Sequence, residues 1–246
     1  MSHWRLDEKY QFLADDLASL DKVFALEGVQ ITQDKISDVI RITRNSTDYY
    51  VKRYRNHNAH LGWRALLPKP RIKNEWQNLR RFSKWGIPTA EVVAFGLERR
   101  GMSFVRGAVV TKGIANTQDL ADLANSKDAR LNSPQWVELI SQQVADITRR
   151  LHSHNFSHND LKWRNILVDK DNKVYLIDCP TGMFWYGPFL QHRIIKDLAC
   201  LDKVAKMVLS NTQRLRFYLA YVQRKSLIAQ DKKIIYKVLN YFLGRE

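Results

Sequence analysis

Cysteine is scarce in this 246-residue sequence, and glycine and proline are few. The two cysteines, Cys179 and Cys200, cannot supply a disulfide framework or a four-thiolate zinc site, and they favour a reducing compartment. Ten glycines and six prolines exclude collagen-like and low-complexity chains. No run approaches the roughly 18 uncharged apolar residues of a membrane span, and the N-terminus has no apolar signal segment. We therefore expect a folded cytoplasmic protein that is neither exported nor membrane-spanning.

Acidic residues are also few, since 25 Asp and Glu face 40 Lys and Arg, for a net charge of +15. Residues 52–84 hold ten basic residues and one acid, and residues 203–246 hold ten and two. Such clustering predicts an anionic partner: nucleic acid, an anionic lipid surface, a phosphorylated substrate or an acidic protein. No zinc-finger or RNA-recognition signature accompanies the charge, so nucleic-acid binding is not the expected function and is kept only as the non-enzymatic alternative, that of a kinase-shaped basic scaffold.

Apolar periodicity predicts an α+β protein with a small antiparallel sheet lobe followed by a mostly helical lobe. The sheet lobe should contain a leader helix over 6–20, one main helix over 71–85, and strands within 22–31, 37–43, 48–54, 90–98 and 103–111. The helical lobe should contain helices over 117–125, 134–152 and 192–209 and two within 212–243. Ser133 is a good N-cap and Pro134 a good first helical residue. We place the boundary at Gly113, with an N-terminal lobe of residues 1–112 and a C-terminal lobe of residues 113–246.

The stretch 156–180, FSHNDLKWRNILVDKDNKVYLIDCP, carries the chemistry. Its two apolar runs flank a turn-forming DKDNK and should pair as a hairpin. Asn165 precedes the first run and Asp178 follows the second, so the hairpin brings both to one end. An amide oxygen beside a carboxylate suits Mg²⁺. Asp160, on the approaching loop, should face the same spot.

The pattern H-N-D-x-x-x-x-N over 158–165, followed by Asp178, resembles the catalytic loop and metal-binding aspartate of the protein-kinase-like fold. The resemblance implies a two-lobed fold that uses ATP and Mg²⁺. It implies that Asp160 orients the acceptor hydroxyl and accepts its proton, while Asn165 and Asp178 hold Mg²⁺. The family has Arg where this sequence has Asn159.

The same resemblance assigns five further residues. Lys162 should face the transferred phosphate, and His158 should brace the loop. Asp197 matches the buried aspartate that caps the catalytic-loop backbone in this fold. Lys52 lies on the third predicted strand, where the fold keeps its phosphate-binding lysine. Glu75, the only acid between 52 and 84, should be the partner of Lys52.

Some features depart from the kinase pattern. Gly28 is the only glycine near the first predicted turn, so the glycine-rich phosphate cover is missing. Tyr50 stands two residues before Lys52, where kinases usually keep a small residue over the adenine. Only 18 residues separate Asp178 from Asp197 and no Ala-Pro-Glu follows, so we do not expect a peptide-docking platform.

Across residues 48–205 the chain is most similar to the bacterial lipopolysaccharide kinase group, the Kdo/WaaP family with its InaA-like members. The similar segments are YYVKRY, RIKNEWQNLRRFSKWGIPTAEVVAFG, HNDLKWRN, VYLIDCP and RIIKDLACLDK. The similarity implies ATP-dependent phosphorylation of a sugar hydroxyl, on heptose or Kdo, of the lipopolysaccharide inner core or lipid A precursor. It implies action at the cytoplasmic face of the inner membrane.

Two aromatic segments have more than one interpretation. Trp63, Leu66 and Leu67 alternate with Arg and Lys, a composition suited to peripheral binding at an anionic membrane; a basic loop whose apolar residues tuck into the sheet lobe is the equal alternative. A second set follows Asp178 and could stack on sugar rings, although core packing is the expectation for most of its members, Phe184, Trp185, Tyr186 and Phe189.

Other functions fit less well. His152, His154 and His158 lack the thiols or the HExxH spacing of a zinc site. No G-x-S-x-G or G-x-x-x-x-G-K-[ST] motif occurs, so the sequence supports neither an α/β-hydrolase nor a P-loop enzyme. Two alternatives to the lipopolysaccharide kinase remain: a small-molecule kinase of the aminoglycoside or choline type, and a catalytically degenerate, kinase-shaped basic scaffold.

Overall fold

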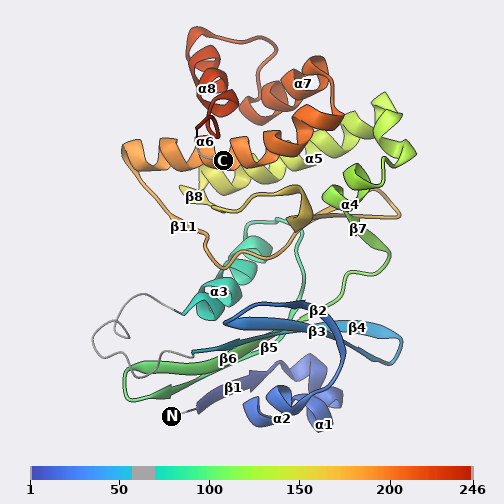
Figure 1. Ribbon diagram of the computed structural model, residues 1–246, viewed down its shortest axis with the longest axis vertical. Helices are drawn as coiled ribbons and strands as arrows, with labels where there is room; N and C mark the ends of the chain where they lie inside the picture. The colour runs from blue at the N-terminus through green and yellow to red at the C-terminus, as the bar shows by residue number, and fades with distance from the viewer. Residues whose placement is uncertain (1, 57–69, 245–246) are drawn as a thin grey trace. The chain divides into compact units, whose positions relative to one another are not determined.

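The computed structural model describes residues 2–56 and 70–244. Contacts divide the chain into two compact units (Figure 1). The sheet unit comprises Met1–Phe82 and Ala90–Ala115, and the helical unit comprises Ser83–Thr89 and Asn116–Glu246. The fold is α+β, with a sheet-rich N-terminal unit and a helical C-terminal unit, which confirms the predicted class. Within the described residues, no helix is both long and apolar enough to cross a membrane.

The sheet unit contains one antiparallel sheet of six strands in the order β1-β5-β6-β4-β3-β2. The strands are β1 (Ser2–Leu6), β2 (Val29–Gln33), β3 (Ser37–Arg44), β4 (Thr47–Arg55), β5 (Val92–Arg100) and β6 (Ser103–Lys112). The pattern did not predict β1, because its sequence SHWRL has little apolar alternation and its partner lies far along the chain. Strand β1 pairs with β5 so closely that a Cβ at Gly96 would collide with the backbone of His3 and Trp4. Glycine is therefore required at this crossing.

Short helices replace the single leader helix predicted over 6–20, so that prediction is wrong. They are η1 (Glu8–Leu13), α1 (Ala14–Leu17) and α2 (Leu20–Ala25). Ser19 ends the first group and caps the next helix, because its side chain accepts a hydrogen bond from the Lys22 amide at 3.2 Å. The strand predicted within 22–31 is wrong in its first half, since residues 22–25 belong to α2 and only β2 is extended.

The two faces of the sheet are covered by different helices (Figure 1). Alternation along β4 sends Val51 into one apolar cluster with Leu17 and Val23 of the short helices. It sends Tyr54 into a second cluster with Ile72 of α3 (Arg71–Lys84), the predicted main helix. Lys52 has the same parity as Tyr54 and therefore points toward α3.

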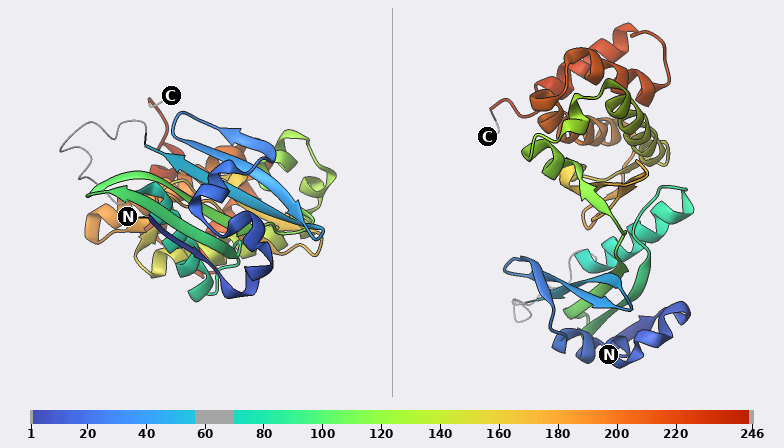
Figure 2. Two further views of the ribbon diagram at one scale, coloured as in Figure 1. Left: turned by 90° about the horizontal axis from the view of Figure 1, so that it is seen from below. Right: turned by 90° about the vertical axis from the view of Figure 1, so that its right-hand side faces the viewer.

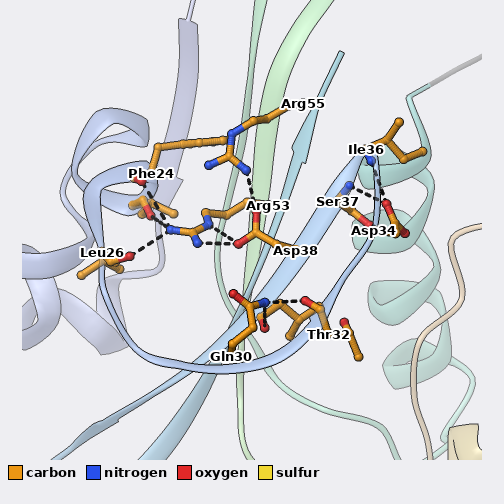
Figure 3. A network of polar contacts seen from close by, with 12 residues as sticks. Phe24, Leu26, Gln30, Thr32, Asp34, Ile36, Ser37, Asp38, Arg53 and Arg55 are labelled. Atoms are coloured by element: carbon orange, nitrogen blue, oxygen red, sulfur yellow. Dashed lines mark hydrogen bonds and ion pairs between the residues drawn. The ribbon is translucent and has the colours of Figure 1, made fainter. Parts of the chain in front are cut away.

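A buried charge network ties the opposite face together (Figure 3). Arg53 and Asp38 are 8% and 5% exposed, and the Arg53 Nε donates to Asp38 Oδ2 at 2.7 Å. The same guanidinium donates to the carbonyl oxygens of Phe24, in the last turn of α2, and of Leu26, just beyond it, at 3.3 and 2.9 Å. Arg55 donates to the other Asp38 oxygen at 2.6 Å. Arg53 thus joins β3, β4 and the segment that leads into β2.

The β2–β3 turn contains no glycine, as the sequence indicated. The Asp34 carboxylate instead accepts hydrogen bonds from the amides of Ile36 and Ser37, each at 2.8 Å (Figure 3). This is an Asx-type turn. Gly28 precedes β2, and a Cβ there would lie 2.6 Å from the Arg41 carbonyl oxygen, so its small size serves strand packing.

The helical unit is built from α4 (Leu120–Asn125), η3 (Ala129–Asn132), α5 (Pro134–Ser153), η4 (Trp163–Asn165), α6 (Gly187–Val208), α7 (Asn211–Val222) and α8 (Ala229–Leu239). Helix α5 packs against α7, and α6 packs against α8 (Figure 2). The predicted cap of α5 is confirmed, since the Ser133 side chain accepts from the Trp136 amide and Pro134 is the first helical residue. Helix α6 begins five residues before the prediction, because Pro188 is tolerated in a first turn whose amides have no helical partners.

Two small sheets complete this unit. Strands β7 (Thr117–Asp119), β9 (Ile166–Asp169) and β10 (Val174–Leu176) form the first, and β8 (Phe156–Ser157) pairs with β11 (Met183–Phe184) in the second. The predicted hairpin is confirmed as β9–β10. The predicted helix over 117–125 is helical only from residue 120, because β7 pairs with β9 first.

Candidate active site

The loop after β8 is held by one buried aspartate. Asp197 of α6 is fully buried and accepts hydrogen bonds from the amides of His158 and Asn159 at 2.8 and 2.9 Å. It also accepts from the Ser157 hydroxyl at 2.8 Å. Four donors, with the His152 ring at 3.4 Å, compensate for its desolvation. The backbone of this loop is thereby fixed at the position that the resemblance implied.

The first two residues of the loop are structural in character. His158 is fully buried, and desolvation lowers the pKa of its imidazole despite the nearby carboxylates of Asp197, Asp178 and Asp160. Asn159 has a left-handed backbone with φ of 64°, a conformation that Asn tolerates well. Its side-chain amide donates to the Thr181 carbonyl oxygen at 2.8 Å. The Asn that replaces the family's Arg therefore anchors the segment after Asp178.

Asp160 is the carboxylate that the loop presents. Its Oδ1 lies 2.6 Å from the Lys162 ammonium, and its Oδ2 lies 3.5 Å from the Arg164 guanidinium. Partial burial favours the protonated form, yet the hydrogen bond and charge of Lys162, with Arg164, hold the pKa of Asp160 below its ordinary value. Asp160 is therefore ionised at neutral pH and able to accept a proton.

Asn165 and Asp178 meet at the end of the β9–β10 hairpin. The Asn165 side-chain amide donates to the Asp160 carbonyl oxygen at 2.9 Å, which leaves its Oδ1 as the atom available to a ligand. The Asn165 carbonyl oxygen accepts from the Ile177 amide at 2.9 Å, directly before Asp178. Asp178 itself has a left-handed backbone with φ of 57°. The hairpin thus places Asn165 and Asp178 at the same end, and the Asn165 side chain contacts the backbone of Asp160.

The donor set fits a magnesium ion. It offers one amide oxygen and carboxylate oxygens, the hard ligands that Mg²⁺ prefers. Among residues 2–56 and 70–244 there is no group of three or more His, Cys, Asp or Glu side chains able to hold a metal. A site with two protein ligands, completed by water and phosphate oxygens, is the usual form for Mg²⁺ beside a nucleotide.

The sheet unit holds the other predicted pair. The Lys52 ammonium lies 3.0 Å from Glu75 Oε2 and 3.2 Å from Oε1, with side chains 17% and 6% exposed. The Tyr54 hydroxyl donates to the same carboxylate at 3.3 Å. The Tyr50 ring packs beside Gly113, where a Cβ would lie 3.2 Å from it. Lys52 and Glu75 are therefore paired across β4 and α3.

The remaining sequence predictions have different outcomes. Trp63, Leu66 and Leu67 lie outside the described residues. Core packing for most of the aromatic set after Asp178 is wrong, because Phe184, Tyr186 and Phe189 are 41%, 68% and 73% exposed. Trp185 is half-buried beneath Arg193, whose guanidinium lies 4.3 Å from the ring.

Two features were not anticipated. One is Arg164, whose only sequence signal is its position four residues after Asp160. The other is an apolar pocket of about 350 Å³ in the helical unit. Its lining includes Trp136, Ile140, Trp163, Leu198, Tyr218 and Leu239.

Comparisons with known proteins agree with this geometry. The profile of the lipopolysaccharide kinase (Kdo/WaaP) family matches residues 25–221. A 3-deoxy-D-manno-octulosonic acid kinase of Mannheimia succiniciproducens is 31% identical over 117 residues, 46% of each chain. The lipopolysaccharide core heptose(I) kinase WaaP of Pseudomonas aeruginosa is 24% identical over 177 residues. That match covers 69% of this chain and 65% of WaaP, so the chain spans about half to two thirds of the length of these relatives.

A solved structure of WaaP in complex with acyl carrier protein has the same fold. It superposes with a TM-score of 0.76 at 21% identity and covers 97% of both chains. The family profile spans most of this chain and includes the loop over residues 158–165, the β9–β10 hairpin and the Lys52–Glu75 pair. The chain belongs to the lipopolysaccharide kinase (Kdo/WaaP) family.

Proposed function

We propose that this protein is an ATP-dependent kinase that phosphorylates a sugar hydroxyl of the lipopolysaccharide inner core. The observation that carries the proposal is an ionised Asp160 beside Lys162, on a loop whose Asn165 bonds the backbone of Asp160 and of Ile177, the residue before Asp178. Family membership supports it, as do relatives named for phosphorylating an octulosonic acid and a heptose.

Each residue would have a defined role. Asp160 orients the acceptor hydroxyl and accepts its proton, most readily at Oδ2, because Lys162 is bonded to Oδ1. Lys162 neutralises charge on the transferred phosphoryl group. Asn165 and Asp178 would hold Mg²⁺, which supplies charge neutralisation on the phosphate oxygens of ATP.

Lys52 would bind ATP phosphates, with Glu75 fixing the direction of its ammonium. The β2–β3 turn contributes less than a glycine-rich loop would, because Asp34 already occupies the amides of Ile36 and Ser37. Phosphate binding would therefore depend on cationic groups more than on backbone amides.

The direct test replaces Asp160. Asp160→Ala should lower kcat by about 10²- to 10⁴-fold with little change in thermal stability, because the loop is held by Asp197 and not by Asp160. The assay follows transfer from labelled ATP to core oligosaccharide. Asp171→Ala, an exposed position on the hairpin turn, is the matched control. Equal turnover by the Asp160 variant and the wild type would defeat the proposal.

Two alternatives are separated by other outcomes. Phosphorylation of aminoglycosides or choline in preference to core oligosaccharide would favour a small-molecule kinase. The absence of any stabilisation by Mg-ATP would favour a scaffold, because a ligand at about 100 times its Kd should add about 2.7 kcal/mol to the free energy of unfolding.

The lipid-linked acceptor suggests that the protein works at the cytoplasmic face of the inner membrane as a peripheral protein. The concentration of Lys and Arg in residues 52–84 supports this location, since anionic lipids attract such segments.

An acidic protein is a second partner that we propose. The structural relative is a complex with acyl carrier protein, and residues 203–246 of this chain contain ten basic residues and two acids. Exposed Lys232, Lys233 and Lys237 on α8 offer charge complementarity, and the apolar pocket lies among the same helices. Calorimetry with acyl carrier protein at rising salt would check it; no binding at low salt would contradict it.

A further inference from the structure

A second cation stands beside the proposed base, and the proposed function gives it no role. Lys162 and Arg164 both face Asp160, with side chains 47% and 61% exposed. On the side of Asp160 that Lys162 and Arg164 flank, two cations face one carboxylate. A hydroxyl that approaches Asp160 from that side therefore meets a cationic surface.

The local fold fixes the backbone of Arg164. It is the middle residue of η4, and both neighbours are buried. The Trp163 indole donates to the Leu201 carbonyl oxygen at 2.9 Å, and the Asn165 side chain donates to the Asp160 carbonyl oxygen at 2.9 Å. The Asn165 amide also donates to the Lys162 carbonyl oxygen at 2.9 Å. The long side chain of Arg164 thus starts from a rigid turn.

The contact with Asp160 does not account for Arg164. Its guanidinium is 3.5 Å from Asp160 Oδ2, longer than the 2.6 Å contact made by Lys162, and an exposed pair of this kind contributes little to stability. Within the described residues the guanidinium has no other partner. Its remaining donors face solvent beside the base, in the planar arrangement that matches a carboxylate or phosphate.

We propose that Arg164 is a specificity-determining residue that binds an anionic group, carboxylate or phosphate, on the acceptor sugar. This inference rests on the proposed kinase function. An ionised base alone repels an acidic sugar, and Lys162 with Arg164 offsets that repulsion on the side of Asp160 that they flank. The bidentate contact would orient the sugar so that one hydroxyl faces Asp160.

The test compares matched acceptors that differ only in charge. One pair is an acceptor ending in the octulosonic acid, with its carboxylate intact or reduced to the alcohol. The other pair is a heptose-bearing acceptor with or without a neighbouring phosphate. Wild-type kcat/KM should be at least about tenfold higher for the anionic member of one pair, and that pair identifies the group.

Arg164→Ala should reduce this preference about 10- to 100-fold, chiefly through a higher KM for the anionic acceptor. Arg164→Lys should restore part of it, because the charge returns without the planar pair of donors. Arg149→Ala is the matched control, since Arg149 is a similarly paired arginine on α5.

The outcomes separate the two proposals. If the wild type phosphorylates no member of either pair, the kinase proposal fails. If it phosphorylates both members equally, or if Arg164→Ala keeps the preference, the role of Arg164 is refuted and the kinase proposal stands. Equal loss on charged and neutral acceptors would make Arg164 structural and would also refute its role.

Discussion

The ionisation of Asp160 depends on the cations around it. Burial of the carboxylate raises its pKa, and the hydrogen bond and charge of Lys162 at 2.6 Å, with the charge of Arg164, together lower it by more. Because the folded-state pKa lies below the ordinary value, activity that needs ionised Asp160 should persist as pH falls and be lost only near that lowered pKa.

Replacing Lys162 should shift the pH at which activity is lost on the acid side of the profile. In Lys162→Met, Arg164 offsets less of the effect of burial than the two cations do together, so the pKa of Asp160 rises and kcat/KM begins to fall at a higher pH than in the wild type. The measurement is the pH profile of kcat/KM for both proteins, with Lys170→Met on the hairpin turn as control. If kcat/KM fell at the same acidic pH in all three proteins, Lys162 would not set the pKa of Asp160.

At the scale of single residues, the sequence allowed the placement of site residues to be predicted where their contacts lie close together along the chain. A short hairpin connects Asn165 with Asp178, and Asn165 bonds the Asp160 backbone five residues earlier, so the spacing of these residues in the sequence was informative. Arg164 was missed because its approach to Asp160 requires the tight turn of η4, which a pattern of residue types does not specify. The roles of these residues remain predictions until variants are measured.

At the scale of elements, long and strongly periodic segments were predicted best. Helix α5 has an N-cap, a first-turn proline and a regular apolar face, and it lies where the pattern placed it. Strand β1 was missed because it depends on pairing with residues 94–98. Helix α2 was predicted as part of a strand because its start depends on the cap at Ser19. Local propensity was overridden in both by contacts that the pattern does not contain.

The network around Arg53 predicts a measurable dependence of the sheet unit on one buried charge. Arg53→Met leaves Asp38 buried with only Arg55, and should lower the free energy of unfolding by about 3 kcal/mol. The double variant Arg53→Met/Asp38→Leu should recover part of this loss, because no buried charge is stranded. Urea unfolding provides the measurement.

The control for this cycle is an exposed pair. Arg44→Met removes a contact between β3 and Asp16 of α1, where the side chains are 42% and 24% exposed, and should lower the free energy of unfolding by less than about 1 kcal/mol. Similar losses for Arg53→Met and Arg44→Met would mean that the buried network does not stabilise the unit.

At the scale of the whole molecule, the basic segments should govern association with anionic surfaces. Replacing Trp63, Arg64 and Arg71 with alanine should reduce flotation with anionic liposomes severalfold and leave neutral liposomes unaffected, because charge and interfacial apolar area are both removed. The control is a second triple variant that replaces Arg99 and Arg100, at the end of β5, and the exposed Met102 of the following turn with alanine. It removes the same amount of charge from another part of the sheet unit. Unchanged flotation of the first variant would contradict the membrane proposal.

The segment after Asp178 has a consequence for regulation. Residues 179–186 are pinned by the β8–β11 pair, by the Asn159 contact with Thr181 and by the Trp185 amide, which donates to the Asn155 carbonyl oxygen at 2.8 Å. Protein kinases are switched on and off by ordering a long, phosphorylatable loop at this point in the chain. This connection is short and anchored at several points, so we expect no switch of that kind and an output that follows the supply of the acceptor.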